Sequence, residues 1–201
     1  MAKRPSNAFK IRELKAKVLI LCEGLTEKNY FNAMKEDFRL PKTIGVDVFQ
    51  SNKVDCKGVV EESIKKAKRE GFEKIFVVFD HDNQPKREEA FKLADDKKIK
   101  VIFSSICFES WYLFHFKNST KAFTSEEVLE KELKKCAGME NYEKNDFKHY
   151  SILKEKLTIA KSNAKKIRLS VIENNYSVEI FNLNPYTNVD ELVDYLESQK
   201  V

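Results

Sequence analysis

Residues 74–83 of the chain read Lys74-Ile-Phe-Val-Val-Phe-Asp-His-Asp-Asn83. The segment from Lys74 to Phe79 is the strongest apolar run in the sequence. A short, continuous apolar run is typical of a strand that is buried on both faces, as the strands of parallel sheets are. Two carboxylates, Asp80 and Asp82, follow this run. The segment therefore predicts a strand of a parallel sheet that ends in acidic side chains.

Similar apolar runs lie on both sides of this segment and predict further strands over residues 17–22, 46–51 and 100–105. Between the runs, apolar residues recur at helical spacing. They predict helices from an N-cap at Thr26 to Phe38, from 59 to 71 and from Pro85 to Lys98. This alternation of strand and helix favours the α/β class, with a parallel sheet of about four strands, right-handed crossovers and flanking helices.

The chain is expected to have three parts within a single structural unit. Residues 1–16 form a basic arm, 17–116 the α/β core, and 117–201 a helical elaboration packed on that core. In the last part we expect helices after Ser125, over 151–172 and after Thr187. With 201 residues and 42% hydrophobic residues, the chain can bury a core of its own. It leaves no room for a separate strand-passage or polymerase domain.

Charge is distributed unevenly along the chain. Lys and Arg exceed Asp and Glu by 37 − 32 = 5. The net charge is +5 in residues 1–17, zero in 18–116, +5 in 117–168 and −5 in 169–201. The two basic parts are compatible with a polyanionic partner, whereas the acidic last part is better suited to a protein contact.

The cysteines, the apolar runs and the first residues of the chain indicate the cellular compartment of the protein. The four cysteines include no Cys-x-x-Cys pair, so we expect buried thiols rather than a zinc or redox site. No apolar run approaches the roughly 20 residues that span a bilayer. The basic start of the chain is not followed by the apolar segment of a signal peptide. We therefore expect a cytoplasmic protein that does not associate with membranes.

Acidic residues follow two of the predicted strands. Glu23 comes after the first strand, and Asp80 and Asp82 come after the third. Ligands of open parallel sheets bind at the carboxyl ends of the strands, so these three side chains are expected to converge. Oxygen ligands of this kind suit Mg²⁺ or Mn²⁺ and phosphoryl-transfer chemistry. A helix-capping role is the alternative for a lone aspartate.

Other residues have two interpretations each. Glu109 follows the fourth strand and is either a helix first-turn acid or a fourth carboxylate at the same edge. The backbone N–H groups of Thr26 and Glu27 could hold a phosphate, orient Glu23 or simply begin a helix. A basic group could track a nucleic-acid backbone or form a solvated helix face. Its members are Lys161, Lys165, Lys166 and Arg168.

Four blocks of the sequence together resemble the RloB family of bacterial and archaeal proteins, and the first two resemble the Toprim fold. The third block has Ser105-Ile106 where the family usually has Asn-Pro, and the second lacks the further acid that is usual near Asn83. The blocks are Leu21-Cys-Glu-Gly-Leu-Thr-Glu-Lys-Asn-Tyr-Phe31, Phe79-Asp-His-Asp82, Ile106-Cys-Phe-Glu-Ser-Trp-Tyr-Leu-Phe-His-Phe116 and Asn184-Pro-Tyr-Thr-Asn-Val-Asp-Glu-Leu-Val193.

The resemblance implies a Toprim-like core and a role in phage defence, sometimes beside an ATPase encoded nearby. Related Toprim proteins are nucleases, so we expect a metal-dependent nuclease that acts on DNA or RNA. Glu23, Asp80 and Asp82 would hold the metal, with Glu109 in support. The family tends to have a Tyr-x-Lys element near Lys144, whose charge could stabilise a phosphate. The alternatives are a solvated lysine and, for the whole protein, a catalytically silent module that binds nucleic acid or a partner. The sequence also leaves open whether the chain forms a homo-oligomer.

Overall fold

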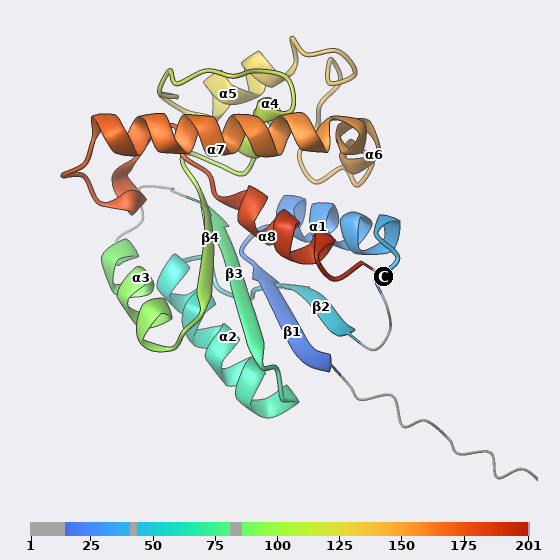
Figure 1. The fold of residues 1–201 in the computed structure, drawn as a ribbon, viewed down its shortest axis with the longest axis vertical. Coiled ribbons are helices and arrows are strands. Elements are labelled where there is room, and N and C mark those ends of the chain that lie inside the picture. The colour runs from blue at the N-terminus through green and yellow to red at the C-terminus, as the bar shows by residue number, and fades with distance from the viewer. Residues whose placement is uncertain (1–14, 41–43, 81–85, 201) are drawn as a thin grey trace, which may run out of the picture.

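The computed structural model describes residues 15–40, 44–80 and 86–200. Four strands form one parallel sheet in the order β2-β1-β3-β4 (Figure 1). Their bounds are β1 Lys15–Cys22, β2 Ile44–Gln50, β3 Lys74–Asp80 and β4 Lys100–Ser104. The α/β class and the four-stranded parallel sheet predicted from the apolar runs are confirmed.

Helices cover both faces of the sheet. Helix α1 (Leu25–Asp37) packs on β1 and β2, whereas α2 (Cys56–Glu70) and α3 (Arg87–Asp96) pack together on the opposite face. The central strands are apolar throughout because both faces are covered, and Val18 to Cys22 are fully buried. Helix α3 begins later than expected, and Pro85 lies outside the described residues.

The second half of the chain forms a helical layer beyond the carboxyl ends of the strands (Figure 1). Its helices are α4 Glu109–Phe114, α5 Glu126–Leu133, α6 His149–Leu153 and α7 Leu157–Asn174. The last helix, α8 (Val189–Glu197), packs instead on a face of the sheet, where it contacts β4 and where Tyr195 meets Phe76 of β3. Two short 3₁₀ segments, Lys154–Lys156 and Ile180–Asn182, lie between these helices. The prediction of a single helix over 151–172 is therefore wrong, since a 3₁₀ turn separates α6 from α7. Tyr150 and Lys154 both bind Asp37 of α1, while α7 packs on α4 and α8.

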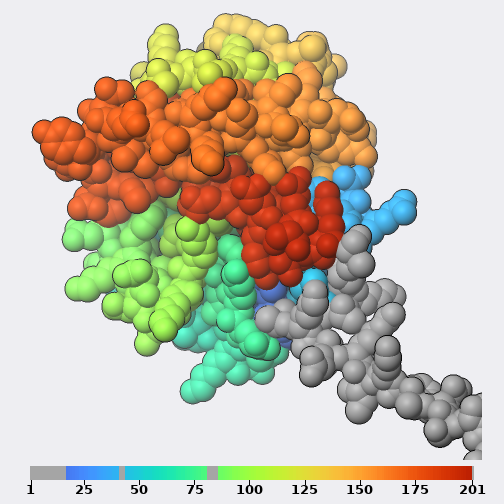
Figure 2. Space-filling model, in the orientation of Figure 1, coloured from blue at the N-terminus to red at the C-terminus, as the bar shows by residue number. Residues whose placement is uncertain are grey.

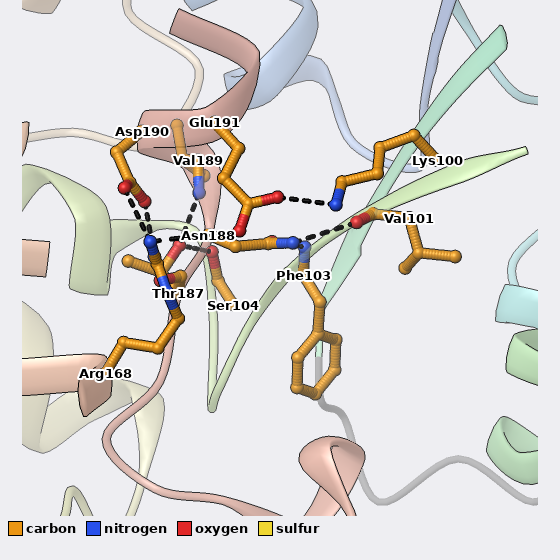
Figure 3. Close-up of polar contacts among 10 residues, drawn as sticks. All are labelled: Lys100, Val101, Phe103, Ser104, Arg168, Thr187, Asn188, Val189, Asp190 and Glu191. Carbon is orange, nitrogen blue, oxygen red and sulfur yellow. Dashed lines mark hydrogen bonds and ion pairs between the residues drawn. The ribbon is translucent and has the colours of Figure 1, made fainter. Parts of the chain in front are cut away.

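The edge of the sheet at β4 is closed by the segment that precedes α8 (Figure 3). Ser104 forms an antiparallel bridge with Thr187, and the N–H of Ser105 donates to the carbonyl of Tyr186. The Asn188 side chain then continues the ladder, because Oδ1 accepts from the N–H of Phe103 at 2.7 Å and Nδ2 donates to the carbonyl of Val101 at 3.0 Å. The block at 184–193, one of the four that resemble the RloB family, therefore contains the residues that cover this edge of the sheet.

Candidate functional site

Acidic residues from three elements meet at the carboxyl end of the sheet. Glu23 follows β1, Asp80 ends β3, and Glu109 begins α4 directly beyond β4. They line a pocket with a volume of about 260 Å³ between the sheet and the helical layer. The lining residues are Glu23, Gly24, Leu25, Thr26, Glu27, Asp80, Phe108, Glu109, Lys144 and Asn145. Asp82, the third predicted ligand, lies outside the described residues.

Glu23 and Asp80 are held side by side because their strands are hydrogen-bonded neighbours. The N–H of Glu23 donates to the carbonyl of Val78 at 2.8 Å, and the N–H of Asp80 donates to Oε2 of Glu23 at 3.4 Å. The Oδ1 atom of Asp80 is buried and has no hydrogen-bond partner among the described residues. Burial raises the pKa of Asp80 well above its usual range, and the charges of Glu27, Glu109 and Glu23 raise it further.

Glu27 is a fourth carboxylate of the pocket, and its side chain was not predicted to take part. Helix α1 has its N-cap at Gly24 rather than Thr26, so Glu27 lies in the first turn with 3% of its surface exposed. A Cβ atom at position 24 would contact the Glu27 carboxylate, so a larger residue there would require that carboxylate to shift. Burial raises the pKa of Glu27 to about 7, and the charges of Glu109 and Glu23 add to this effect.

The position of Glu27 also changes the interpretation of the α1 N-terminus. The backbone N–H groups of Gly24 and Glu27 interact with the Glu27 carboxylate and oppose the rise in its pKa. This arrangement matches one half of a capping box, in which an acid at the third helical position reaches back to the N-cap. The helix terminus is therefore occupied by a side chain of its own helix. The Glu-Gly-x-x-Glu spacing was the available signal for this residue.

Glu109 is buried at the pocket wall, with 1% of its surface exposed. Tyr142, from the segment between α5 and α6, donates a hydrogen bond from its hydroxyl to Oε1 of Glu109. Burial and the Glu109 charge both raise the pKa of Tyr142, so its hydroxyl stays protonated. The turn that leads to Glu109 contains Ile106 at φ 64°, an unfavourable conformation for a β-branched residue. Tyr142 is the tyrosine of the Tyr-x-Lys element, but its contact with Glu109 was not predicted, because the two residues lie 33 positions apart in the chain.

Lys144 and Asn145 bring polar groups to the same pocket. Lys144 forms an ion pair with Glu126. Burial acts to lower the pKa of Lys144, but Glu126 and Glu109 outweigh burial and raise it. The carbonyl of Asn145 accepts from Asn29 at 2.8 Å, and its side-chain Oδ1 accepts from Thr26 at 3.1 Å. The segment that contains Lys144 and Asn145 is thereby fastened to α1.

The four basic residues predicted to bind nucleic acid are in different environments. Arg168 binds both carboxylate oxygens of Asp190, at 2.5 and 2.8 Å, and donates to the carbonyl of Thr187 (Figure 3). Lys161 pairs with Asp194 at 2.6 Å and Glu197 at 2.5 Å. Lys165 and Lys166 are exposed and form no ion pair within the described part of the chain. Two of the four charges are thus balanced by α8.

The donors of the pocket fit a hard divalent cation. Several carboxylates share one small volume, and the buried Asp80 Oδ1 lacks a partner within the described ranges. In residues 15–40, 44–80 and 86–200, no group of three or more His, Cys, Asp or Glu side chains is arranged around a common metal position. Mg²⁺ commonly binds one or two protein carboxylates and keeps several waters, so the donor set present is compatible with it.

Fold and site together define a parallel α/β protein with an acidic pocket at the carboxyl edge of its sheet. A model of the family described as RloB-like protein matches residues 18–196. The chain therefore belongs to the RloB-like family. Neither a curated protein nor a solved structure matches it. Among the described residues, no helix has the length and apolar character needed to cross a bilayer.

Proposed function

We propose that the protein is a metal-dependent nuclease that hydrolyses phosphodiester bonds of DNA or RNA. The observation that carries the proposal is the meeting of Glu23, Asp80 and Glu109 in one pocket whose lining also includes Lys144. The pocket lies at the edge of a parallel sheet where ligands usually bind. Membership of the RloB-like family supports a Toprim-like site and a role in antiviral defence, sometimes beside an ATPase encoded nearby.

The proposed mechanism assigns a role to each side of the pocket. Glu23 and Asp80, with Asp82, would hold Mg²⁺ or Mn²⁺ through carboxylate oxygens. A divalent cation held there would supply Lewis-acid polarisation of a phosphodiester. Lys144 would stabilise the negative charge that develops on the phosphate, and its ion pair with Glu126 keeps it protonated and oriented. Glu23 is the candidate for proton transfer, because it lies beside Asp80 at the pocket edge.

The first prediction is that Asp80→Ala and Glu23→Ala each abolish cleavage. Single- and double-stranded DNA and RNA would be incubated with Mg²⁺, Mn²⁺ or EDTA, with and without any ATPase that is encoded beside the gene. We expect cation-dependent cleavage by the wild-type protein and a loss of roughly 100-fold or more in each variant. Asp95→Ala, which removes an exposed acid of α3, is the matched control and should retain full activity.

Cleavage that persists in both site variants would contradict the mechanism. Binding of nucleic acid that needs no metal, with no cleavage of any substrate, would instead support the second candidate, a catalytically silent binding module. One observation favours this candidate, namely that the described acids do not surround a common metal position.

A further inference from the structure

The segment between α5 and α6 contacts two other helices, α1 and α4, each of which brings an acidic side chain to the pocket. At one end, the hydroxyl of Tyr142 donates to Glu109, the first residue of α4. At the other end, Asn145 accepts hydrogen bonds from Thr26 and Asn29 of α1. This four-residue stretch, Tyr142 to Asn145, therefore fixes α1 and α4 relative to one another at the pocket.

The Tyr142 ring is itself held in place from two directions. It stacks at a tilt of 31° on His149, with the ring centroids 4.6 Å apart, and meets Tyr112 edge-on at 6.2 Å. Only 2% of the Tyr142 surface is exposed. A ring packed in this way points its hydroxyl in one direction, because rotation about its χ angles is blocked by neighbours.

Glu109 interacts with a second side chain besides Tyr142. It lies at the start of a short helix, next to Cys107, whose thiol interacts with the same carboxylate. A buried carboxylate needs hydrogen-bond donors, and a neutral phenol supplies one without cancelling the negative charge. Lys144 forms its ion pair with Glu126. Tyr142 thus supplies the side-chain hydrogen bond that fixes the plane of the Glu109 carboxylate.

We infer that Tyr142 is a positioning residue, which orients the Glu109 carboxylate at the pocket wall so that it can support a bound divalent cation. This inference rests on the proposed function and adds to it a residue that acts through Glu109. Residues that hold metal ligands by hydrogen bonds typically change metal affinity or activity by roughly 10–100-fold when they are replaced.

The test compares two buried tyrosines that each donate to a carboxylate. Tyr142→Phe removes the hydroxyl beside the pocket and keeps the ring stacked on His149. Tyr150→Phe removes the hydroxyl that donates to Asp37 at 3.1 Å, at the opposite end of α1 from the pocket, and is the matched control. Mn²⁺ affinity would be measured by isothermal titration calorimetry and by the electron paramagnetic resonance signal of free Mn²⁺, alongside Tm.

We expect Tyr142→Phe to weaken Mn²⁺ binding by about 10-fold or more and Tyr150→Phe to leave it within about 2-fold of wild type. In a Glu109→Gln background, Tyr142→Phe should have no further effect on Mn²⁺ affinity, because Tyr142 acts through Glu109. This second comparison is valid even if Tyr142→Phe lowers Tm. Glu109→Gln and the double variant can both be titrated at a temperature below their unfolding transitions.

Equal Mn²⁺ affinity of the wild type and Tyr142→Phe would overturn this inference and leave the proposed function standing. An equal loss in Tyr142→Phe and Tyr150→Phe would overturn it as well, since the effect would then be one of general stability. A wild-type protein that binds no Mn²⁺ would overturn the proposed function, and the inference with it.

Discussion

At the residue scale, Glu27 combines nearly complete burial with three acidic neighbours. Its pKa is raised to about 7 by burial first and by Glu109 and Glu23 next. The unfolded chain would ionise this carboxyl near pH 4.5. Between these two values the folded protein binds more protons than the unfolded one, so stability falls as pH rises. In the absence of a cation, Glu27 therefore opposes folding at neutral and alkaline pH.

We predict that Glu27→Gln stabilises the metal-free protein. Glutamine keeps an oxygen that can accept from the Gly24 N–H but carries no charge. The free energy of unfolding, measured by urea titration in EDTA, should exceed that of the wild type by about 1–3 kcal/mol at pH 8. The difference should shrink by roughly 2 kcal/mol at pH 5, where Glu27 is protonated in the folded protein.

The control for Glu27 is Glu127→Gln, which replaces an exposed acid in the first turn of α5. This variant should change the free energy of unfolding by no more than about 0.5 kcal/mol at either pH. A Glu27→Gln variant that is less stable than the wild type at pH 8 would show that the charged form is favoured in the fold.

At the element scale, the edge of the sheet at β4 is covered by a later segment of the chain. The edge at β4 is covered by residues 186–188, and the Asn188 side chain takes the place of a further pair of strand hydrogen bonds. Asparagine suits this role because its amide carries an acceptor and a donor in the same plane, as a peptide group does. Exposed strand edges invite association with other chains, so this cover also protects β4.

We predict that Asn188→Asp destabilises the fold by about 2–3 kcal/mol, because it places a charge at a buried position and leaves the Val101 carbonyl without its donor. Urea unfolding would measure the loss, and hydrogen exchange at the Phe103 amide would localise it to β4. Asn174→Asp is the control, since that asparagine is exposed and bonds only within α7. Equal stability of both variants would show that the ladder at Asn188 contributes nothing.

The elements and the site differed in how far the sequence could predict them. The strands follow from local apolar runs, and burial on both faces leaves no polar position within Val18–Cys22. Glu23 and Asp80 could be predicted because every parallel strand delivers its last residue to one edge. The Tyr142 hydroxyl and the Asn145 anchors could not, because they depend on how a later loop folds over α1 and α4.

At the scale of the whole molecule, charge that is separated along the chain is brought together by the fold. The basic stretch 117–168 and the acidic stretch 169–201 meet where α7 lies beside α8 (Figure 2). Arg168 binds Asp190, and Lys161 binds Asp194 and Glu197. Segment charges therefore overstate the basic surface available to a polyanion. Lys165 and Lys166 are the members of the predicted group that stay exposed.

This distribution predicts opposite phenotypes for neighbouring basic residues. Arg168→Ala should lower the free energy of unfolding by about 3 kcal/mol or more, because it leaves the buried Asp190 without its partner. Lys166→Ala should alter stability by no more than about 0.5 kcal/mol. If the exposed lysines contact nucleic acid, Lys166→Ala should weaken binding and reduce the slope of log affinity against log salt by about 1.

The structural role of Arg168 can be separated from a nucleic-acid contact by a double-mutant cycle with Asp190. If the two side chains stabilise the fold as a pair, Arg168→Ala with Asp190→Ala should cost at least about 1 kcal/mol less than the sum of the single variants. Unfolding would be followed in urea, and nucleic-acid affinity measured on whichever variants stay folded. An Arg168→Ala variant with unchanged stability and weakened binding would contradict the pairing argument. Arg168 would then belong to the same polyanion-binding surface as Lys165 and Lys166, because a side chain that can leave Asp190 can also contact a phosphate.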